Sequence, residues 1–425
     1  MRKNVYFVLI AALMALAMWL WVQRIAIPHQ IAEAAEQGSP RGNLSDLYPR
    51  WLGTRELLLR HRDPYSAEIT REIQTGYYGR PIDSARPSDP KDQQAFAYPV
   101  YVVFLLAPTI WLPFATVQKV FLWLLVGLTA ASIPIWLRTL EWKVSMPSSL
   151  TWIVLALGSF PAIQGFKLQQ LTLLVAFFVA AALFLVSQRN FVGAGIVLAL
   201  ASIKPQLVFL VVLWLIIWVL GDWRGRQRLF WSYPLSMTVL VVAGEFVWPG
   251  WIGEFRSATS AYYNYTGGGR SVLDVELTPF GGRPVAAILI AAILVLIWKS
   301  RTVAVESSDF RWLLALVLTT TLVVIPMFAP YNQLLLLPAC MLIVRDLKAL
   351  WNRHWVSRLL VVITGVAVLW PWLTAICLTT ALLFLPATSV QKAWALPLFT
   401  SLYIPELLLG VLLVQRGVPR ANEPR

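Results

Sequence analysis

The chain has 425 residues, of which 58% are apolar, and its mean hydropathy is +0.66. Soluble domains are usually about 45–50% apolar, so this composition excludes a soluble fold and indicates an integral membrane protein. The formal net charge of +14 does not indicate nucleic-acid binding, because Lys and Arg gather in short connectors between apolar runs. That distribution is typical of the cytoplasmic connectors of membrane proteins.

The residue types that hold metals or disulfides are scarce. The two cysteines, Cys340 and Cys377, lie in apolar runs, and the three histidines are scattered over loops. We therefore expect no disulfide framework, no metal site and no cofactor. No Walker sequence, G-x-S-x-G or HExxH occurs either, so an activated donor would have to arrive in the lipid phase.

Apolar runs long enough for membrane helices recur from end to end. They predict an all-α polytopic bundle of about ten to thirteen transmembrane helices, since a span needs about 20 apolar residues. The first run follows Arg2 and Lys3 and ends in tryptophans, which favours an uncleaved anchor over a signal peptide. The expected division is an anchor helix (1–23), a first external loop (24–97), a transmembrane module (98–248), a second external loop (249–284), C-terminal transmembrane helices (285–415) and a basic tail (416–425).

A short helix is expected within the first external loop. Pro49 suits the first turn of a helix, and leucines and Trp51 form one apolar stripe that favours a helix lying on the outer membrane surface. Asp46 stands just before this helix, where the helix dipole favours a carboxylate. Two interpretations stay open: Asp46 or Ser45 is a simple N-cap, or Asp46 is functional. Asp63 precedes Pro64 in an ordinary turn signature.

Two topologies are compatible with the charges. We prefer one in which 99–137 makes a single net crossing and 191–203 and 207–220 are separate short helices. The competing scheme gives 99–114 and 117–137 a crossing each and fuses 191–220 into one bent helix. The preferred scheme brings the unusual polar groups to one external face.

Four ionisable residues stand at or within apolar runs: Lys167, Lys204, Glu245 and Glu406. A charge at bilayer depth costs about 2.5–3.5 kcal/mol on insertion scales, so each is either a functional candidate or a side chain that snorkels to the interface. Pro205 follows Lys204, and such helix breaks usually line a cavity. A carboxylate that faces a cation suits a transfer reaction on a lipid phosphate.

The order of several motifs resembles a known family. The motifs are 46-DLYPRW-51, 60-RHRDPY-65, 96-FAYPVY-101, 168-LQQLTLL-174, 203-IKPQ-206 and 330-PYNQ-333. Together they resemble the polyprenyl-phosphate-sugar-dependent glycosyltransferases of the GT-C superfamily, most closely glycosyltransferase family 87, the alpha-mannosyltransferase-like group. The chain departs from the family pattern at Arg60 or His61 and at Gln169, where the family has glycine, and at Val100, where it has a second proline.

The resemblance implies roles for individual residues. Asp46 takes the position of the catalytic base, and Lys204 that of the contact to the donor phosphate. Arg270 and Arg283, from the second external loop, are further candidates for the phosphate. The candidates for the lining of the pocket are Asp63, Tyr65, Tyr98, Lys167, Gln170, Gln206, Tyr331 and Asn332.

The leading hypothesis is an inverting glycosyltransferase. It would move a mannose-like hexose or a pentose from a polyprenyl-phosphate donor to a glycan, glycolipid or lipid acceptor, on the external face of the inner (plasma) membrane, without nucleic acid or cofactor. The alternative is a multi-pass transporter or flippase with its four intramembrane charges along one path. The placement of the ionisable residues distinguishes the two hypotheses, because a transferase should have them close to Asp46. A scaffold protein is a third possibility.

Overall fold

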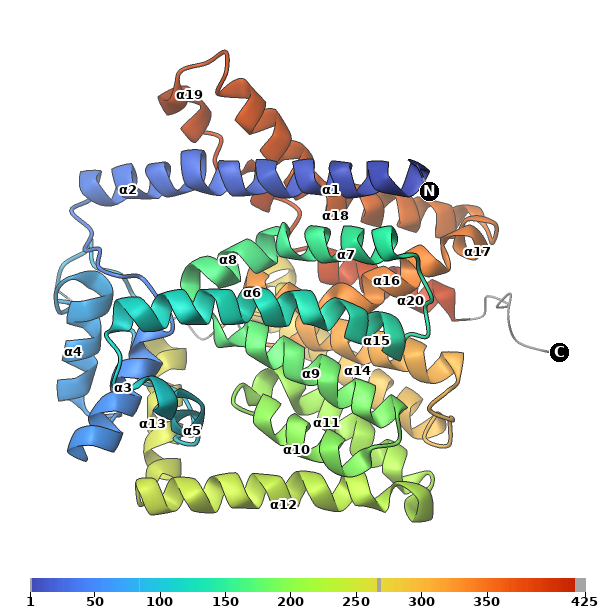
Figure 1. The fold of residues 1–425 in the computed structure, drawn as a ribbon, viewed down its shortest axis with the longest axis horizontal. Helices are drawn as coiled ribbons and strands as arrows, with labels where there is room; N and C mark the ends of the chain where they lie inside the picture. The colour runs from blue at the N-terminus through green and yellow to red at the C-terminus, as the bar shows by residue number, and fades with distance from the viewer. Residues whose placement is uncertain (1, 84, 266–268, 327, 417–425) are drawn as a thin grey trace.

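The computed structural model describes residues 2–83, 85–265, 269–326 and 328–416, and every regular element in these ranges is helical (Figure 1). This confirms the predicted all-α membrane fold. Within the described ranges, five helical segments are long and apolar enough to cross a membrane: Val5–Glu36, which joins α1 (Arg2–Trp21), η1 (Val22–Ala26) and α2 (Ile27–Glu36), then α6 (Phe114–Thr139), α12 (Trp223–Val247), α14 (Val272–Lys299) and α18 (Trp355–Ala381). A bent pair, α7 (Met146–Leu157) and α8 (Phe160–Leu168), adds a sixth candidate with a bend of 54°.

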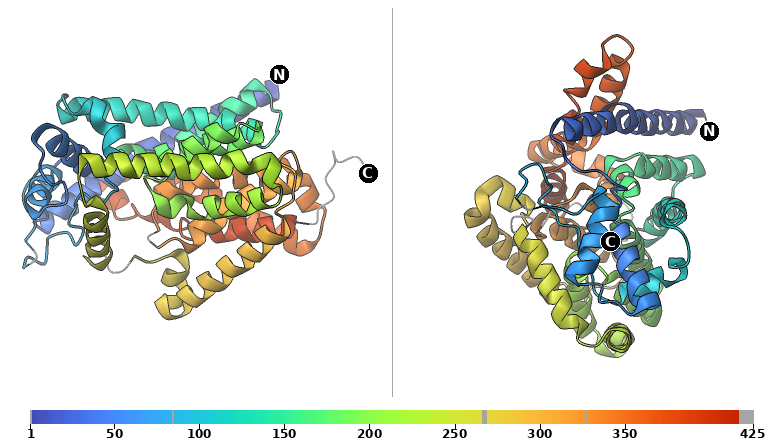
Figure 2. Two further views of the ribbon diagram at one scale, coloured as in Figure 1. Left: turned by 90° about the horizontal axis from the view of Figure 1, so that it is seen from below. Right: turned by 90° about the vertical axis from the view of Figure 1, so that its left-hand side faces the viewer.

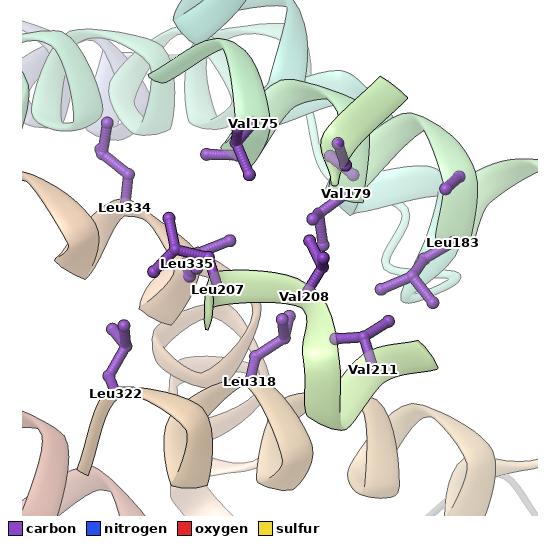
Figure 3. Close-up of a cluster of buried hydrophobic side chains, with 14 of the residues drawn as sticks. Val175, Val179, Leu183, Leu207, Val208, Val211, Leu318, Leu322, Leu334 and Leu335 are labelled. Atoms are coloured by element: carbon purple, nitrogen blue, oxygen red, sulfur yellow. The ribbon is translucent and has the colours of Figure 1, made fainter. Parts of the chain in front are cut away.

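Shorter helices fill the centre of the bundle. They are α9 (Leu171–Ser187), α10 (Phe191–Ala201), α11 (Pro205–Leu220), α15 (Ser308–Val324), η3 (Pro330–Leu336), α16 (Leu337–Arg345) and α20 (Ile404–Gln415). Figure 3 shows side chains of α9, α11, α15 and η3 packed together, among them Val179, Val208 and Leu318. Helices α9 and α11 are apolar on all sides, which is typical of helices buried in a bundle. The number of long spans is below the expected ten to thirteen because polar turns divide several apolar runs into these shorter helices.

The N-terminal helix continues beyond residue 23, where the anchor was expected to end. A π-helical turn, η1, carries it into α2, which ends at Glu36 just before Gly38. The segment packs along α7 and α18 (Figure 1), and Trp21 Nε1 donates to the backbone oxygen of Trp394, near α19 (Ala387–Gln391) and η4 (Leu396–Leu398). Pro28 does not end the helix, because it falls in the first turn of α2 directly after the π turn; the helix ends just before Gly38, which has a positive φ.

The run 99–114 does not form a span of its own. It contains α5 (Val102–Leu106) and the 3₁₀ turn η2 (Ala107–Thr109), and Pro113 then starts α6. A helix of five residues is about 8 Å long, far short of the hydrocarbon core of about 30 Å. Helices α10 and α11 are separate, with Lys204 between them. Both observations agree with the preferred topology and not with the competing one.

Three helices from the two long loops gather at one end of the bundle and form a cap. They are α3 (Tyr48–Arg60), α4 (Ala67–Tyr78) and α13 (Trp251–Tyr265), and they run across the direction of the long helices (Figures 1 and 2). Arg62 joins α3 to α4 through Glu56 at 2.6 Å and Glu72 at 2.5 Å. The opposite end carries α17 (Leu347–Trp351) and the start of α1 (Figure 1).

Candidate active site

A cavity of about 480 Å³ lies between the cap and the bundle. Its wall combines residues of the first loop, the helix breaks at 169–170 and 202–204, helix α13 and the turn before η3. The polar residues on the wall are Asp46, Arg50, Asp92, Gln94, Tyr98, Gln170, Lys204, Gln206, Thr259, Tyr262, Tyr263, Tyr331 and Asn332. Segments that are far apart in the sequence therefore meet at one polar cavity.

Asp46 does not cap helix α3. The N-cap residue is Leu47, and no side chain caps this helix, so the interpretation of Asp46 or Ser45 as a simple N-cap is wrong. Instead, Asp46 Oδ1 accepts a hydrogen bond from the Tyr77 hydroxyl at 3.0 Å, and Oδ2 accepts one from the Gln170 amide. The backbone N–H of Asp46 donates to the Leu168 oxygen at 2.8 Å. These contacts hold the carboxylate on the wall of the cavity.

Lys204 supplies a buried positive charge to the same wall. Its side chain enters from the break between α10 and α11, and the residue is only 7% exposed. Nζ donates to Gln170 Oε1 at 2.8 Å and to Thr172 Oγ1 at 2.6 Å. It also faces the Tyr331 ring, 5.4 Å from the ring centroid. Both hydrogen-bond partners are neutral, and a buried charge without an opposite charge is costly, so the position suits an anionic ligand.

Gln170 links the carboxylate to the cation. Its amide nitrogen donates to Asp46, while its amide oxygen accepts from Lys204. The preceding residue, Gln169, has a left-handed backbone with φ 49°, which ends α8 and lets α9 begin directly after Gln170. Thr172, in the first turn of α9, donates to Asn332 Oδ1 at 3.2 Å. The break between α8 and α9 thus fixes the relative position of the two charged groups.

Arg50 is a cavity residue that the sequence analysis missed. Its guanidinium carbon lies 4.4 Å from the centroid of the Tyr98 ring, and Nη1 donates to the backbone oxygen of Asp46 at 2.6 Å. Its Nε is buried without a hydrogen-bond partner among the described residues. The spacing of four from Asp46 puts both residues on one side of a helical turn, which is a signal that the sequence does contain.

Asp92 is a second carboxylate on the wall. Burial raises its pKa, and the charge of Asp46 adds to this rise, while hydrogen bonds from Gln94 and the charge of Arg50 oppose it. The backbone N–H of Gln94 donates to Asp92 Oδ1 at 3.0 Å, and its side-chain amide donates to Oδ2 at 2.9 Å. Asp92 lies in a polar loop without helical or motif context, so sequence reasoning had no signal for it.

Seven of the twelve predicted site residues line the cavity: Asp46, Tyr98, Gln170, Lys204, Gln206, Tyr331 and Asn332. Asp63 is the turn residue that its sequence context indicated, since its Oδ1 accepts from the Tyr65 N–H at 2.8 Å. The Tyr65 hydroxyl donates to the backbone oxygen of Tyr98 at 2.6 Å. These two residues therefore do not line the cavity but hold the backbone of Tyr98, which does.

The other three predicted residues are not part of the cavity lining. Lys167 Nζ donates to Gln30 Oε1 of α2 at 2.9 Å. Arg270 is exposed, and its backbone oxygen accepts from the Phe328 N–H. Arg283 is also exposed and donates to the Tyr263 hydroxyl at 3.5 Å. We therefore assign the phosphate to neither arginine, because neither residue lines the cavity.

The charges within the spans do not form a path. Lys204 converges with Asp46, but neither Glu245 nor Glu406 lines the cavity. Glu245 accepts from the Gly250 N–H at 2.7 Å at the end of α12, and Glu406 faces Glu276 of α14. This placement is the one expected of a transferase rather than of a transporter.

Few groups on the wall could hold a metal ion. Asp46 and Asp92 are its carboxylates, and no group of three or more His, Cys, Asp or Glu side chains is placed to bind a metal within the described ranges. The chemistry available there is a hydrogen-bonded carboxylate, two cations, amides and aromatic rings. Such a set can take up a proton and neutralise an anion in the same cavity.

Comparison with known proteins identifies the family. The family model of glycosyltransferase family 87 matches residues 96–326, more than half of the chain. The matched range includes Tyr98, Gln170, Lys204 and the cap helix α13. No curated protein and no solved structure matches the chain. Membership implies a donor and an acceptor substrate in a membrane environment. The chain therefore belongs to glycosyltransferase family 87 and is a multi-pass membrane glycosyltransferase.

Proposed function

We propose that the enzyme moves a sugar from a polyprenyl-phosphate donor to an acceptor hydroxyl with inversion, and that Asp46 is the general base. The observation that carries this proposal is the chain of contacts from Asp46 through Gln170 to Lys204 on the cavity wall. It joins a proton acceptor to a buried cation by one rigid amide. A sugar bound between them would have the attacking and leaving groups on separate sides.

The charges on the wall support a phosphate-linked donor. Lys204 and Arg50 both approach the Tyr98 ring, at 5.8 Å and 4.4 Å from its centroid. Neither takes part in a salt bridge within the described part of the chain. An anion that enters the cavity would therefore meet two cations that are not held in salt bridges, although Asp46 and Asp92 lie on the same wall. A lipid-borne phosphate fits best, because the chain has no recognisable nucleotide motif.

The positions of these groups support the following reaction. The carboxylate of Asp46 takes the proton of the acceptor hydroxyl, and the acceptor oxygen forms a bond to the anomeric carbon. The bond from that carbon to the phosphate oxygen breaks, and its electron pair leaves with the polyprenyl phosphate. Lys204 and Arg50 stabilise the negative charge that develops on the leaving oxygen. The Asp46 proton later passes to water.

The lining favours a polyhydroxylated ligand. The amides of Gln94, Gln206 and Asn332 offer donors and acceptors, and Tyr262 and Tyr331 offer aromatic faces. A mannose-like hexose or a pentose matches this combination, with a glycan, glycolipid or lipid as acceptor. We place the reaction on the external side, since the basic connectors gather at the other end of the bundle.

The decisive experiment is Asp46→Asn. Asparagine keeps the size and the hydrogen-bonding capacity of the side chain but cannot take the proton. We expect kcat for transfer from a polyprenyl-phosphate sugar to fall by about 100-fold or more, the usual contribution of a general base, with an unchanged melting temperature. The matched control is Asp63→Asn, which preserves the turn at Tyr65 and should retain full activity. If Asp46→Asn were as active as Asp63→Asn, Asp46 would not be the general base.

A further inference from the structure

One side of helix α12 carries an uninterrupted exposed stripe. The spacing of three and four residues places its members on one face of the helix. From the start of the helix to its end they are Arg224, Arg228, Trp231, Leu235, Val239, Val242 and Phe246. Leu235 is 66% exposed and Phe246 is 86% exposed. The stripe is therefore cationic for one turn, aromatic at the next, and apolar along the rest of the helix.

Helix α10 completes a groove beside this stripe. The two helices approach closely, since a Cβ on Gly195 would come within 2.0 Å of Ser232 Oγ, and Ser232 donates to the backbone oxygen of Phe191. A groove of about 710 Å³ lies at the start of both helices, lined by Arg189, Phe191, Val192, Arg224, Gly225, Gln227, Arg228, Trp231, Ser232 and Leu235. Exposed Val192 and Ile196 continue its apolar side along α10.

The groove has an excess of positive charge. Arg224 and Arg228 are exposed, and no salt bridge within the described ranges includes either. Arg189 pairs with Glu306 at 2.7 Å at the rim. Arg226 points away from the groove and donates to the backbone oxygens of Trp218 and Val303. Two arginines one helical turn apart are therefore available to one anionic group.

The groove is lined by the first turns of α10 and α12, and these turns lie at the end of the bundle opposite the cap (Figure 1). Gly221, just before α12, packs against the backbone of Arg301 after α14, and α12 reaches the cap helix α13 at its other end. Trp223 and Trp231 are exposed at the level of the arginines, as in the aromatic belts at membrane interfaces. Arginines beside exposed tryptophans are typical of the headgroup level, and a long exposed apolar stripe is typical of the hydrocarbon core.

We propose that this groove binds an anionic phospholipid. Its phosphate lies between Arg224 and Arg228, and its acyl chains follow the apolar stripe of α12 and the exposed side of α10. Basic recesses between membrane helices bind acidic headgroups in this way, and arginine pairs well with phosphate oxygens. The apolar stripe below the arginines favours a lipid over free phosphate. The site is separate from the glycosyltransferase cavity and does not depend on the proposed reaction.

The test is native mass spectrometry of the full chain in detergent with phosphatidylglycerol or phosphatidylcholine. We expect the wild type to retain phosphatidylglycerol several-fold better, and the double variant Arg224→Gln/Arg228→Gln to lose this preference. The control variant Lys143→Gln/Lys348→Gln removes the same amount of charge from exposed residues at the same end of the bundle. This control should keep the preference for phosphatidylglycerol.

Three results would overturn the assignment. They are equal retention of the two lipids by the wild type, a preference that survives in the double arginine variant, and displacement of the lipid by inorganic phosphate at the same concentration. Full glycosyltransferase activity of the double arginine variant shows that it is folded. A further variant, Arg224→Lys/Arg228→Lys, should keep most of the preference because it keeps the charge.

Discussion

At the scale of single residues, the sequence already contained the two groups at the centre of the site. Lys204 could be singled out because a cation in an apolar run is costly, whereas a carboxylate at a helix start is favourable, so Asp46 was singled out by the family motif; both residues line the cavity. Gln170 was predicted as a site residue only because it lies in a motif of the family. Arg50 could have been found from its spacing of four from Asp46, but Asp92 reaches the wall through the fold of the first loop, and no local sequence pattern predicts that position.

Lys204 is the residue on which donor binding should depend most. Lys204→Gln keeps a hydrogen-bonding side chain but removes the charge, so we expect kcat/KM for the lipid donor to fall by about 10- to 100-fold, as for a lost charge-assisted hydrogen bond. Lys204→Arg should recover part of the loss. Lys167→Gln is the control, since Lys167 contacts Gln30 outside the cavity. Donor kinetics check this, and equal loss in both Gln variants would contradict the role of Lys204.

Asp92 should make stability depend on pH. Its pKa is raised, first by burial and then by Asp46, so the folded state holds this proton at pH values where the unfolded chain has released it. Stability from this group is therefore present at low pH and is lost as pH rises through the folded pKa. We expect Asp92→Asn to melt higher than the wild type, with an advantage that grows between about pH 4 and pH 7.

Asp89, a neighbouring carboxylate, serves as the control because its pKa is shifted in the opposite direction. The Arg80 guanidinium, 2.5 Å from Asp89, lowers the pKa of that carboxyl, and a backbone hydrogen bond from Asp83 adds to the effect. Asp89→Asn should therefore melt lower than the wild type at neutral pH, with a deficit that disappears on acidification. If the two variants depended on pH in the same direction, the assignment of Asp92 would fail. Melting curves of the purified variants provide the comparison.

At the scale of elements, helix starts were easier to predict than helix ends. Pro49 and Pro205 lie in the first turns of α3 and α11, where proline is favoured because its missing N–H is not needed. The predicted end of the N-terminal helix, at residue 23, was too early by more than three turns. The π turn η1, which carries the helix onward, has no simple sequence pattern. The run 99–114 looked like a span, but Pro108 and Pro113 limit α5 to five residues.

At the scale of the whole molecule, the candidate active site and the basic connectors lie at opposite ends of the bundle. The cap, the cavity and the helix breaks lie at one end, and the basic connectors and the proposed lipid groove lie at the other (Figure 1). Positive connectors are retained on the cytoplasmic side. In the proposed reaction, a donor with a long isoprenoid chain is used from the external leaflet, with its phosphate at the break before Pro205.

This arrangement predicts the accessibility of each end in intact cells. Lys91 is exposed beside Asp92 at the cap, and Lys348 is exposed at the opposite end. In a variant without Cys340 and Cys377, Lys91→Cys should react with a membrane-impermeant maleimide from outside, whereas Lys348→Cys should react only after permeabilisation. Activity of both variants confirms that they are folded. The reverse labelling pattern would place the cavity in the cytoplasm, where the donor would have to present its sugar from the inner leaflet.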